Sequence, residues 1–333
     1  MLSWKPRSGK RQRVVGRVGS RDKASTGANS PGLDDSARSE SSRSEVQDLF
    51  PGNRTDGVRV LHTPDNAVVD IVFLHGLTGS ADKTFLHVES HTYWPVHLLT
   101  KDITDARILT FGYDANVVNF FDSAGQNTLQ SHALDLIGDL ADKRDTQSSA
   151  TRKIFFIAHS LGGLVVKQAM ALSKSESQQH LKSIQEHTAG IVFLGTPHRG
   201  SDLAALANAV NAIVKATGKN TNADIMQVLK RDSQLLASVE KFFGNWVNES
   251  RARIELACFC EELGVRQVGM VVTRESASIP DWPSLSIHAN HMDMTKFASS
   301  EDLGYQRILG QLKRWIRPLR AQQGQYVPSS AGN

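Results

Sequence analysis

The chain has 333 residues, of which 40% are hydrophobic, and its 38 Lys and Arg against 34 Asp and Glu leave a formal net charge of +4. A chain of this length and apolar content can bury one sizeable core. The sequence has no apolar run that approaches the roughly twenty residues of a membrane-spanning helix. Much of the basic excess lies in the N-terminal segment, so we infer no nucleic-acid partner from the charge.

Residues 1–56 differ in composition from the rest, because Ser, Arg and Gly dominate and aromatic residues are almost absent. A segment with so few apolar residues cannot bury a core, so we expect a disordered basic tail. Its first 21 residues hold seven Lys or Arg and no acid, as mitochondrial targeting segments often do, although Pro6 interrupts an amphipathic helix. A nuclear or acidic-surface patch around Lys10–Arg13, or a tail without an address, fits equally well.

Between residues 57 and 320, short apolar strands alternate with helical patterns, as a mostly parallel sheet flanked by helices requires. We predict helices over Thr128–Lys143 and Leu161–Ser173, a single α/β domain over 57–320, and a disordered C-terminus over 321–333. The predicted central strands carry few polar residues and are therefore expected to be buried on both faces; they are Val69–Leu74, Arg107–Phe111, Lys153–Ile157, Gly190–Leu194 and Ile254–Cys260.

The first of these strands runs into a turn that contains glycine, His75-Gly76-Leu77. In hydrolases that carry a nucleophilic serine at the end of a parallel strand, a loop of this kind supplies one of the two backbone N–H groups that bind an oxyanion. We expect the N–H group of Leu77 to be that donor. An ordinary strand-to-helix loop is the alternative interpretation.

Residues 154–163, Ile-Phe-Phe-Ile-Ala-His-Ser-Leu-Gly-Gly, hold the strongest motif in the chain. An apolar strand breaks into a turn in which Ala158 and Gly162 lie two positions either side of Ser160, and a helical pattern follows. Strand, turn and helix together are the setting of a nucleophile elbow. Ser160 is therefore the predicted nucleophile, and the N–H group of Leu161 is the predicted second oxyanion donor. A Ser-x-Gly turn without chemistry is the alternative.

The stretch from 200 to 251 separates two predicted strands and is too long for a plain loop. Two helical patterns lie within it, Leu203–Val214 and Ile225–Phe243. We expect a helical cap that covers Ser160 and lines an acyl pocket. Ordinary packing of these helices on the sheet is the equally weighted alternative, because an apolar helical stripe is more often core than ligand site.

Along the chain, the serine should be followed first by the acid and then by the histidine that acts as base. Of the histidines, only His288 and His291 lie far enough downstream, and we prefer His291 because it falls in the loop beyond the short Leu285–Ile287 strand. A metal site built from this pair has no accompanying cluster of carboxylates or cysteines at ligand spacing. For the acid, Glu261 leaves the sheet at the expected strand end, and Glu275 is the second candidate.

The two cysteines, Cys258 and Cys260, lie two apart on one predicted strand, too constrained to form an ordinary disulfide with each other. A reducing compartment is therefore favoured. We expect an intracellular protein, cytoplasmic or mitochondrial, that is not secreted. The glycosylation patterns at Asn53 and Asn248 are then chance matches.

Six motifs along the chain resemble a family of serine esterases related to the serine active site-containing protein. They also resemble lipase-like hydrolase domains of fungal proteins. The resemblance covers about residues 58–317 and implies an α/β-hydrolase fold with Ser160 as nucleophile and His291 as base. Family members often read Phe-x-Glu-Thr where this chain has Glu261. The chain departs from the family at two positions. It has Ala158 where family members often have Gly, and Asn290 where they commonly have Asp. The motifs are His75–Gly79, Tyr93–Pro95, Ala106–Asp114, Phe156–Leu164, Gly195–Ser201 and Ala289–Phe297.

Together these residues predict a serine hydrolase that cleaves carboxylic esters through an acyl-enzyme, with Ser160, His291 and either Glu261 or Glu275 as the catalytic groups. The resemblance implies lipid or other acyl esters as substrates. Thioester hydrolysis or acyl transfer would use the same residues. A non-catalytic module that binds a lipid or a partner is the alternative from another class. We expect no cofactor and no metal, and leave peripheral membrane contact and the oligomeric state open.

Overall fold

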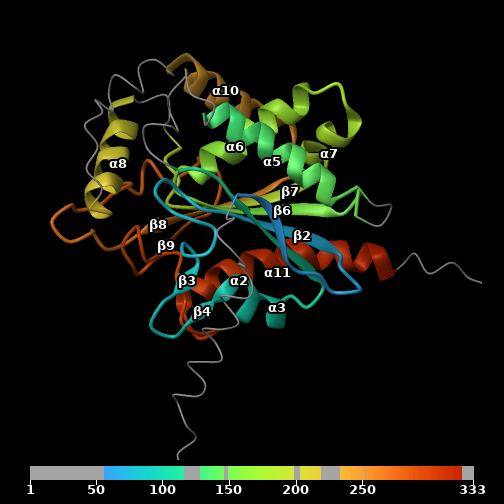
Figure 1. The fold of residues 1–333 in the computed structure, drawn as a ribbon, viewed down its shortest axis with the longest axis horizontal. Helices are drawn as coiled ribbons and strands as arrows, with labels where there is room; N and C mark the ends of the chain where they lie inside the picture. Colours follow the sequence, from blue (N-terminus) through green and yellow to red (C-terminus); the bar gives the residue numbers. More distant parts are fainter. Residues whose placement is uncertain are drawn as a thin grey trace, which may run out of the picture.

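The fold of the protein was obtained as a computed structural model (Figure 1). The structure describes residues 56–115, 128–145, 149–198, 203–218, 233–251 and 253–324. The tail predicted to be disordered lies, up to residue 55, outside the described residues, as do 325–333 and the first part of the predicted helix at 225–243.

A seven-stranded sheet forms the centre of the domain, in the order β1-β5-β2-β6-β7-β8-β9. β1 pairs antiparallel with β5, and all other neighbours in the sheet are parallel. The predicted strands are confirmed, with ends shifted by one or two residues. The strands are β1 (Gly57–His62), β2 (Val69–Leu74), β5 (Ala106–Gly112), β6 (Lys153–His159), β7 (Thr188–Leu194), β8 (Glu255–Glu261) and β9 (Ser284–Ile287), and β3 (Leu86–His87) pairs separately with β4 (Thr92–Tyr93).

The edge strand β1 was not predicted, and its burial shows why. Among its six residues only Val58 is buried, so the strand lacks the apolar run that marks the inner strands. β2 and β5, in contrast, are buried at every position. An edge strand that pairs on one side carries a weaker hydrophobic signal than a strand covered on both faces.

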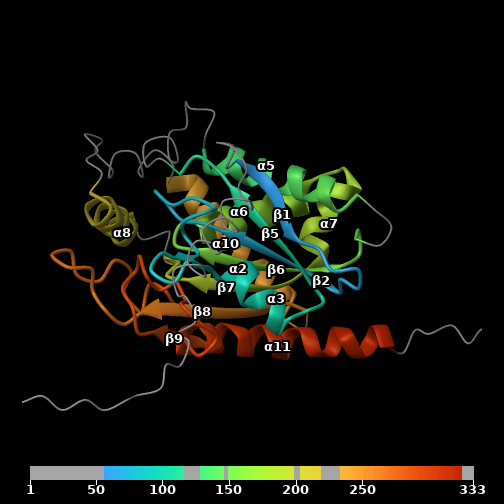
Figure 2. The same ribbon diagram turned by 60° about the horizontal axis from the view of Figure 1, so that its bottom comes forward.

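Helices cover both faces of the sheet (Figures 1 and 2). The helices α5, α6, α7 and α10 lie on one face, and α2, α3 and α11 lie on the other. α8 lies beyond the end of the sheet toward which β8 points (Figure 2). The helices are α2 (Trp94–His97), α3 (Leu99–Asp102), α5 (Leu129–Lys143), α6 (Gly162–Ser175), α7 (Gln179–His187), α8 (Leu203–Ala216), α10 (Ser233–Glu249) and α11 (Leu303–Gly324).

Several helices end later than predicted, α6 and α8 by two residues each. α10 continues past residue 243, because Trp246 and Val247 extend its buried face beyond Gly244. α11 runs to Gly324, so the expected boundary of the domain at residue 320 falls inside a helix and the expectation of disorder from residue 321 is wrong for its first four residues. The buried residues Ile308, Leu312 and Ile316 lie four apart and anchor this helix on the sheet.

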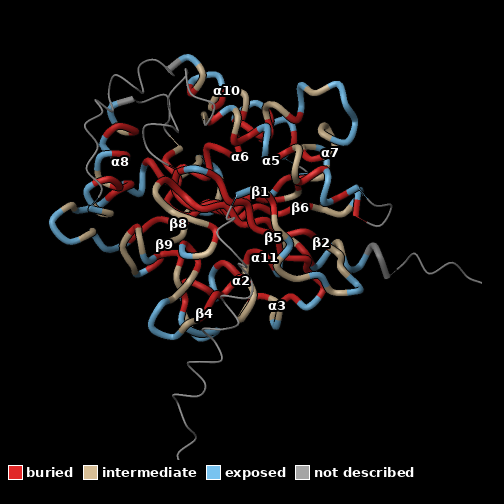
Figure 3. Tube along the Cα trace, in the orientation of Figure 1, coloured by how far each residue is buried: buried red, intermediate tan, exposed pale blue. Residues whose placement is uncertain are grey.

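The core consists of two apolar layers, one on each face of the sheet (Figure 3). Side chains alternate between these layers along a strand: Ile71 and Phe73 of β2 join the layer that includes α11, and Val72 and Leu74 join the layer that includes α5 and α6. Burial on both faces is what a parallel sheet covered by helices requires. The sheet, held between these two layers, then fixes the positions of the residues at the strand ends.

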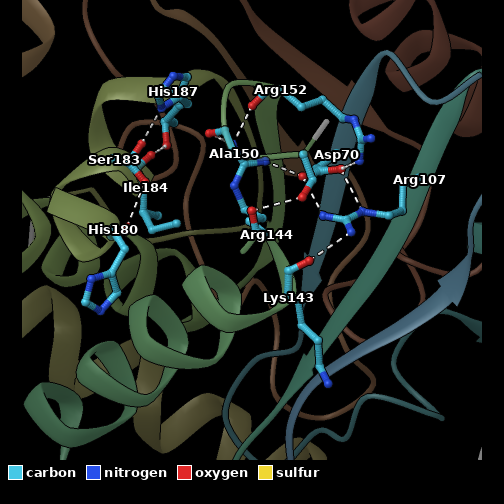
Figure 4. Close-up of polar contacts among 12 residues, drawn as sticks. Asp70, Arg107, Lys143, Arg144, Ala150, Arg152, His180, Ser183, Ile184 and His187 are labelled. Carbon is cyan, nitrogen blue, oxygen red and sulfur yellow. Dashed lines mark hydrogen bonds and ion pairs between the residues drawn. The ribbon is translucent and has the colours of Figure 1, made fainter. Parts of the chain in front are cut away.

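A buried carboxylate joins several elements at the amino-terminal edge of the sheet (Figure 4). Asp70 of β2 is fully buried and accepts hydrogen bonds from Arg107 at 2.9 Å, from Arg152 at 2.9 Å and from Arg144. Burial lowers the pKa of the Arg144 guanidinium below its ordinary value. These contacts tie β2, β5, the end of α5 and the start of β6 together, at the edge opposite Ser160, and they compensate a charge that would otherwise be costly to bury.

Candidate active site

Ser160 lies in the sharp turn between β6 and α6 and has a backbone conformation that is rare for its residue type. Its φ is +53°, in the left-handed region that side chains with a Cβ avoid. Its N–H group donates to the Leu194 carbonyl at 2.8 Å, and its own carbonyl accepts from Thr196 Oγ1 at 2.9 Å. The turn is therefore strained and held from the neighbouring strand β7, as a nucleophile elbow requires.

Two glycines allow the loops to meet closely at this turn. A Cβ on Gly76 would lie 2.6 Å from the Cβ of Ser160, and a Cβ on Gly162 would lie 2.3 Å from the carbonyl oxygen of His75. Both distances are too short for any side chain, so the loop after β2 packs directly against the turn. The small-residue spacing around Ser160 in the sequence reflects this contact.

The side chains of Ser160, His291 and Glu261 form a continuous chain of hydrogen bonds. His291 Nε2 lies 3.0 Å from Ser160 Oγ, and His291 Nδ1 lies 2.7 Å from Glu261 Oε2. A carboxylate only accepts, so Nδ1 carries the proton and Nε2 is left to accept from the serine hydroxyl. All three residues are almost completely buried, with exposed fractions of 1%, 0% and 3%.

The second oxygen of Glu261 is held by the backbone. Its Oε1 accepts from the N–H groups of Val271 at 2.5 Å and Val272 at 3.1 Å. With the proton of His291, the buried carboxylate thus has three donors, which fix its orientation and compensate its charge. The sequence contained no signal for these donors, because any residue supplies a backbone N–H group.

Glu275, the other candidate acid, lies on an exposed part of the β8–β9 connection. It lines a cavity of about 540 Å³ together with Lys167, Phe243 and Trp282. His288, the other candidate base, is also exposed, and its Nδ1 lies 2.9 Å from Glu262. Within the part of the chain that the structure describes, no three or more His, Cys, Asp or Glu residues gather as they would around a metal ion.

The two predicted oxyanion donors lie in the loops that meet at Ser160. Leu77 and Leu161 are buried, and within the described residues neither backbone N–H group has a hydrogen-bond acceptor. Buried N–H groups normally find a partner, so two buried donors without one in the loops that meet at Ser160 are unusual. Such donors are what a developing oxyanion needs.

The loop that carries Leu77 is braced by Tyr113, a residue that the sequence did not single out. His75 Nδ1 donates to the Gly76 carbonyl at 3.0 Å, and the Tyr113 N–H group donates to His75 Nε2 at 3.2 Å. The Tyr113 hydroxyl donates to the His75 carbonyl at 2.7 Å, and the two rings stack with centroids 4.2 Å apart. Burial lowers the pKa of His75 to about 4, so its ring is neutral near pH 7.

The two insertion helices lie differently. α10 packs on α6, where Lys167 Nζ donates to Glu240 at 2.7 Å. Phe243 of α10 also reaches β7, where its ring lies 5.9 Å from that of Phe193. These contacts are what the alternative interpretation, ordinary packing of the helices on the domain, expects for α10. α8 lies at the carboxyl-terminal edge and buries Leu206, Val210 and Ile213 (Figure 2). A cap over Ser160 stays a prediction for α8.

Comparison with known proteins identifies the family. A family described as "Putative serine esterase (DUF676)" matches residues 66–243, more than half of the chain. The chain belongs to this family. The match covers both the loop after β2 and the turn that carries Ser160, and the predicted α/β-hydrolase fold, a mostly parallel sheet flanked by helices, is confirmed.

Individual relatives are more distant. The protein SERAC1 of Homo sapiens is 26% identical over 291 residues, which are 80% of this chain and 42% of that protein, and SERAC1 of Danio rerio is 24% identical over 277 residues. The chain thus spans about two fifths of the length of these curated relatives. Among solved structures, esterase B from Lactobacillus rhamnosis is similar with a TM-score of 0.47 and 10% identity, covering 86% of this chain and 95% of that one. A hyperthermophilic esterase from Pyrobaculum calidifontis is similar with a TM-score of 0.46 and 16% identity, covering 85% and 92%.

No helix among the described residues has the length and apolar character needed to cross a membrane.

Proposed function

We propose that this member of the serine esterase family hydrolyses carboxylic esters through an acyl-enzyme on Ser160. The observation that supports this most directly is the continuous chain of hydrogen bonds from Glu261 through His291 to Ser160, with distances of 2.7 and 3.0 Å. Base and nucleophile within hydrogen-bond reach, with a third group orienting the base, are the geometric mark of an activated serine.

In the acylation step, Ser160 Oγ attacks the ester carbonyl carbon while His291 Nε2 accepts the hydroxyl proton. Glu261 accepts the hydrogen bond from Nδ1 throughout and stabilises the imidazolium that forms. The N–H groups of Leu77 and Leu161 donate to the oxyanion of the tetrahedral intermediate. When the intermediate collapses, the imidazolium gives its proton to the departing alkoxide, and an alcohol leaves.

In the deacylation step, water enters and His291 accepts one of its protons. The resulting hydroxide adds to the acyl carbon, and the same two N–H groups hold the second oxyanion. The C–O bond to Ser160 then breaks, His291 returns the proton to Oγ, and a carboxylic acid leaves. Base, acid and nucleophile are thereby restored.

We place the substrate among lipid or other acyl esters. The apolar residues Leu77 and Leu161 lie in the two loops that meet at Ser160, and all three residues are buried, which favours an apolar acyl group. Thioester hydrolysis and acyl transfer to an alcohol would use the same groups, so the leaving group and the acceptor define the reaction. α8 is the element that we expect to contact the acyl chain.

The proposal is tested with the full chain and a series of p-nitrophenyl esters of increasing acyl length, with a thioester of matched length beside them. A stopped-flow burst of p-nitrophenol, equal in amplitude to the enzyme concentration and absent in Ser160→Ala, supports an acyl-enzyme. Equal hydrolysis by Ser160→Ala would overturn the proposal. Absence of hydrolysis by a folded wild-type protein would favour the non-catalytic binding module.

A further inference from the structure

His159, the residue directly before Ser160, faces the backbone of His291. It is the last residue of β6 and is 5% exposed. Its Nε2 lies 3.1 Å from the main-chain carbonyl oxygen of His291, 132 residues away in the chain. The two imidazole rings lie 4.9 Å apart at an angle of 40°.

The contact requires a hydrogen on Nε2 of the His159 ring. A carbonyl oxygen only accepts, so His159 Nε2 must carry the hydrogen and donate it. The pKa of His159 lies well below its ordinary value. Burial is the main cause, and the electrostatic effect of the neighbouring His291 is the second. The other titratable groups that act on this ring are His75 from the loop after β2 and Lys296 from the loop after β9. His159 is therefore a neutral donor while the enzyme works.

The chain just before His291 is also tied to the end of β8, where the N–H groups of Glu262 and Leu263 donate to the Ala289 carbonyl at 3.2 and 3.1 Å. The turn around His291 is closed locally, by hydrogen bonds from the N–H groups of Asp293 and Met294 to the Asn290 carbonyl. Gly195 packs against the imidazole ring of His291, because a Cβ at this position would lie 2.8 Å from His291 Cε1. The hydrogen bond from His159 thus attaches the main chain of His291 to the central strand that also carries Ser160.

We propose that His159 is a positioning residue, which sets the distance between the base and the nucleophile because one dipeptide carries both Ser160 and the donor that holds the His291 backbone. This inference rests on the proposed esterase function for its consequence on rate. Holding reacting groups within a few tenths of an ångström is worth orders of magnitude, since a misplacement of about 1 Å costs roughly 100-fold.

The kinetic test compares His159→Phe, which keeps a ring and removes the donor, with His159→Gln, whose amide N–H group can reach the same carbonyl. We expect His159→Phe to lower kcat roughly 10- to 100-fold with KM within about twofold, and His159→Gln to recover most of the loss. The acid limb of the pH profile should persist in His159→Phe, because His159 takes up no proton during the reaction. A lost acid limb would instead make His159 the base and overturn the proposal.

The matched control is His187→Asn. His187 of α7 also bonds a main-chain carbonyl, that of Ser183 at 2.8 Å (Figure 4). It directly precedes the start of β7, whereas Ser160 follows the end of β6, so the two lie at opposite edges of the sheet. The activity of His187→Asn should stay within about twofold of wild type, since surface changes away from a site rarely matter. If His159→Phe does not fold, His159→Asn takes its place, because its shorter side chain keeps a polar group but leaves the donor short of the carbonyl.

A second readout needs no ester turnover. In full-length protein labelled with ¹⁵N-histidine, the Nδ1 proton shared by His291 and Glu261 should give a low-field resonance in wild type and His159→Gln, and exchange broadening should remove it in His159→Phe. An unchanged resonance together with unchanged kcat in a folded His159→Phe protein would overturn the proposal. If wild type hydrolyses no ester, the esterase proposal fails, while this resonance still decides the role of His159.

Discussion

Replacement of Glu261 by Gln should change the hydrogen-bonding pattern of the base while leaving the fold intact. The amide oxygen of Gln can still accept from the N–H groups of Val271 and Val272, which lie 2.5 and 3.1 Å from Glu261 Oε1. The amide nitrogen then faces His291 Nδ1, where the carboxylate oxygen lies 2.7 Å away in the native protein. Because the amide donates, His291 must accept at Nδ1 and carry its proton on Nε2.

That tautomer cannot take a proton from Ser160. The expected loss is about 10⁴-fold in kcat, the size found when an aspartate that orients a histidine is replaced by its amide in a serine protease. The free energy of unfolding should change little, because the two backbone donors keep their acceptor. Glu261→Ala should in addition lose about 1–3 kcal/mol of stability for each N–H group left unpaired.

The assay combines kcat on a p-nitrophenyl ester with urea unfolding of the same preparations, and Glu275→Gln is the matched control. The exposed Glu275 should tolerate the change with kcat within about twofold, as surface substitutions usually do. Glu261 does not orient the base if Glu261→Gln retains more than about a tenth of the wild-type kcat, or if Glu275→Gln shows the larger loss.

Three further predictions follow from single contacts. Gly76→Ala should lower kcat at least about 100-fold, because its Cβ would lie 2.6 Å from that of Ser160 and must displace the loop that carries Leu77; steady-state kinetics on the folded variant checks this. Asp70→Asn should destabilise the protein by about 3–5 kcal/mol in urea unfolding, because three buried guanidinium groups lose their counter-charge, while kcat of the folded protein stays unchanged. Stability should fall as the pH drops from about 6.5 to about 4, because the unfolded chain binds a proton at His75 that the native state does not; the contribution is on the order of 3 kcal/mol, and His75→Gln should flatten this part of the curve in thermal unfolding against pH.

The sequence could predict those parts of the molecule that depend on local pattern. The inner strands were found because burial on both faces leaves continuous apolar runs, and the serine turn because a strand, small residues and a helix follow one another within a short segment. β1 escaped prediction because only one of its six residues is buried, so this edge strand lacks a continuous apolar run. The end of α10 was misjudged because Gly244 interrupts a pattern that Trp246 resumes.

The supporting contacts of the candidate site depend on residues far apart in the chain, and sequence patterns do not report them. The choice between Glu261 and Glu275 needed the path of the β8–β9 connection, which returns the backbone of Val271 to the end of β8. Tyr113 braces His75 from a different strand loop, and His159 holds the carbonyl of His291. Such contacts are set by the register of the sheet rather than by local spacing.

The central claim is that Ser160 is an activated nucleophile, and covalent labelling tests it most directly. Full-length wild type and Ser160→Ala are incubated with a fluorophosphonate, and intact mass spectrometry counts the adducts. We expect one adduct on wild type and none on Ser160→Ala. A folded wild-type protein without an adduct, or an adduct that persists in Ser160→Ala, would contradict it.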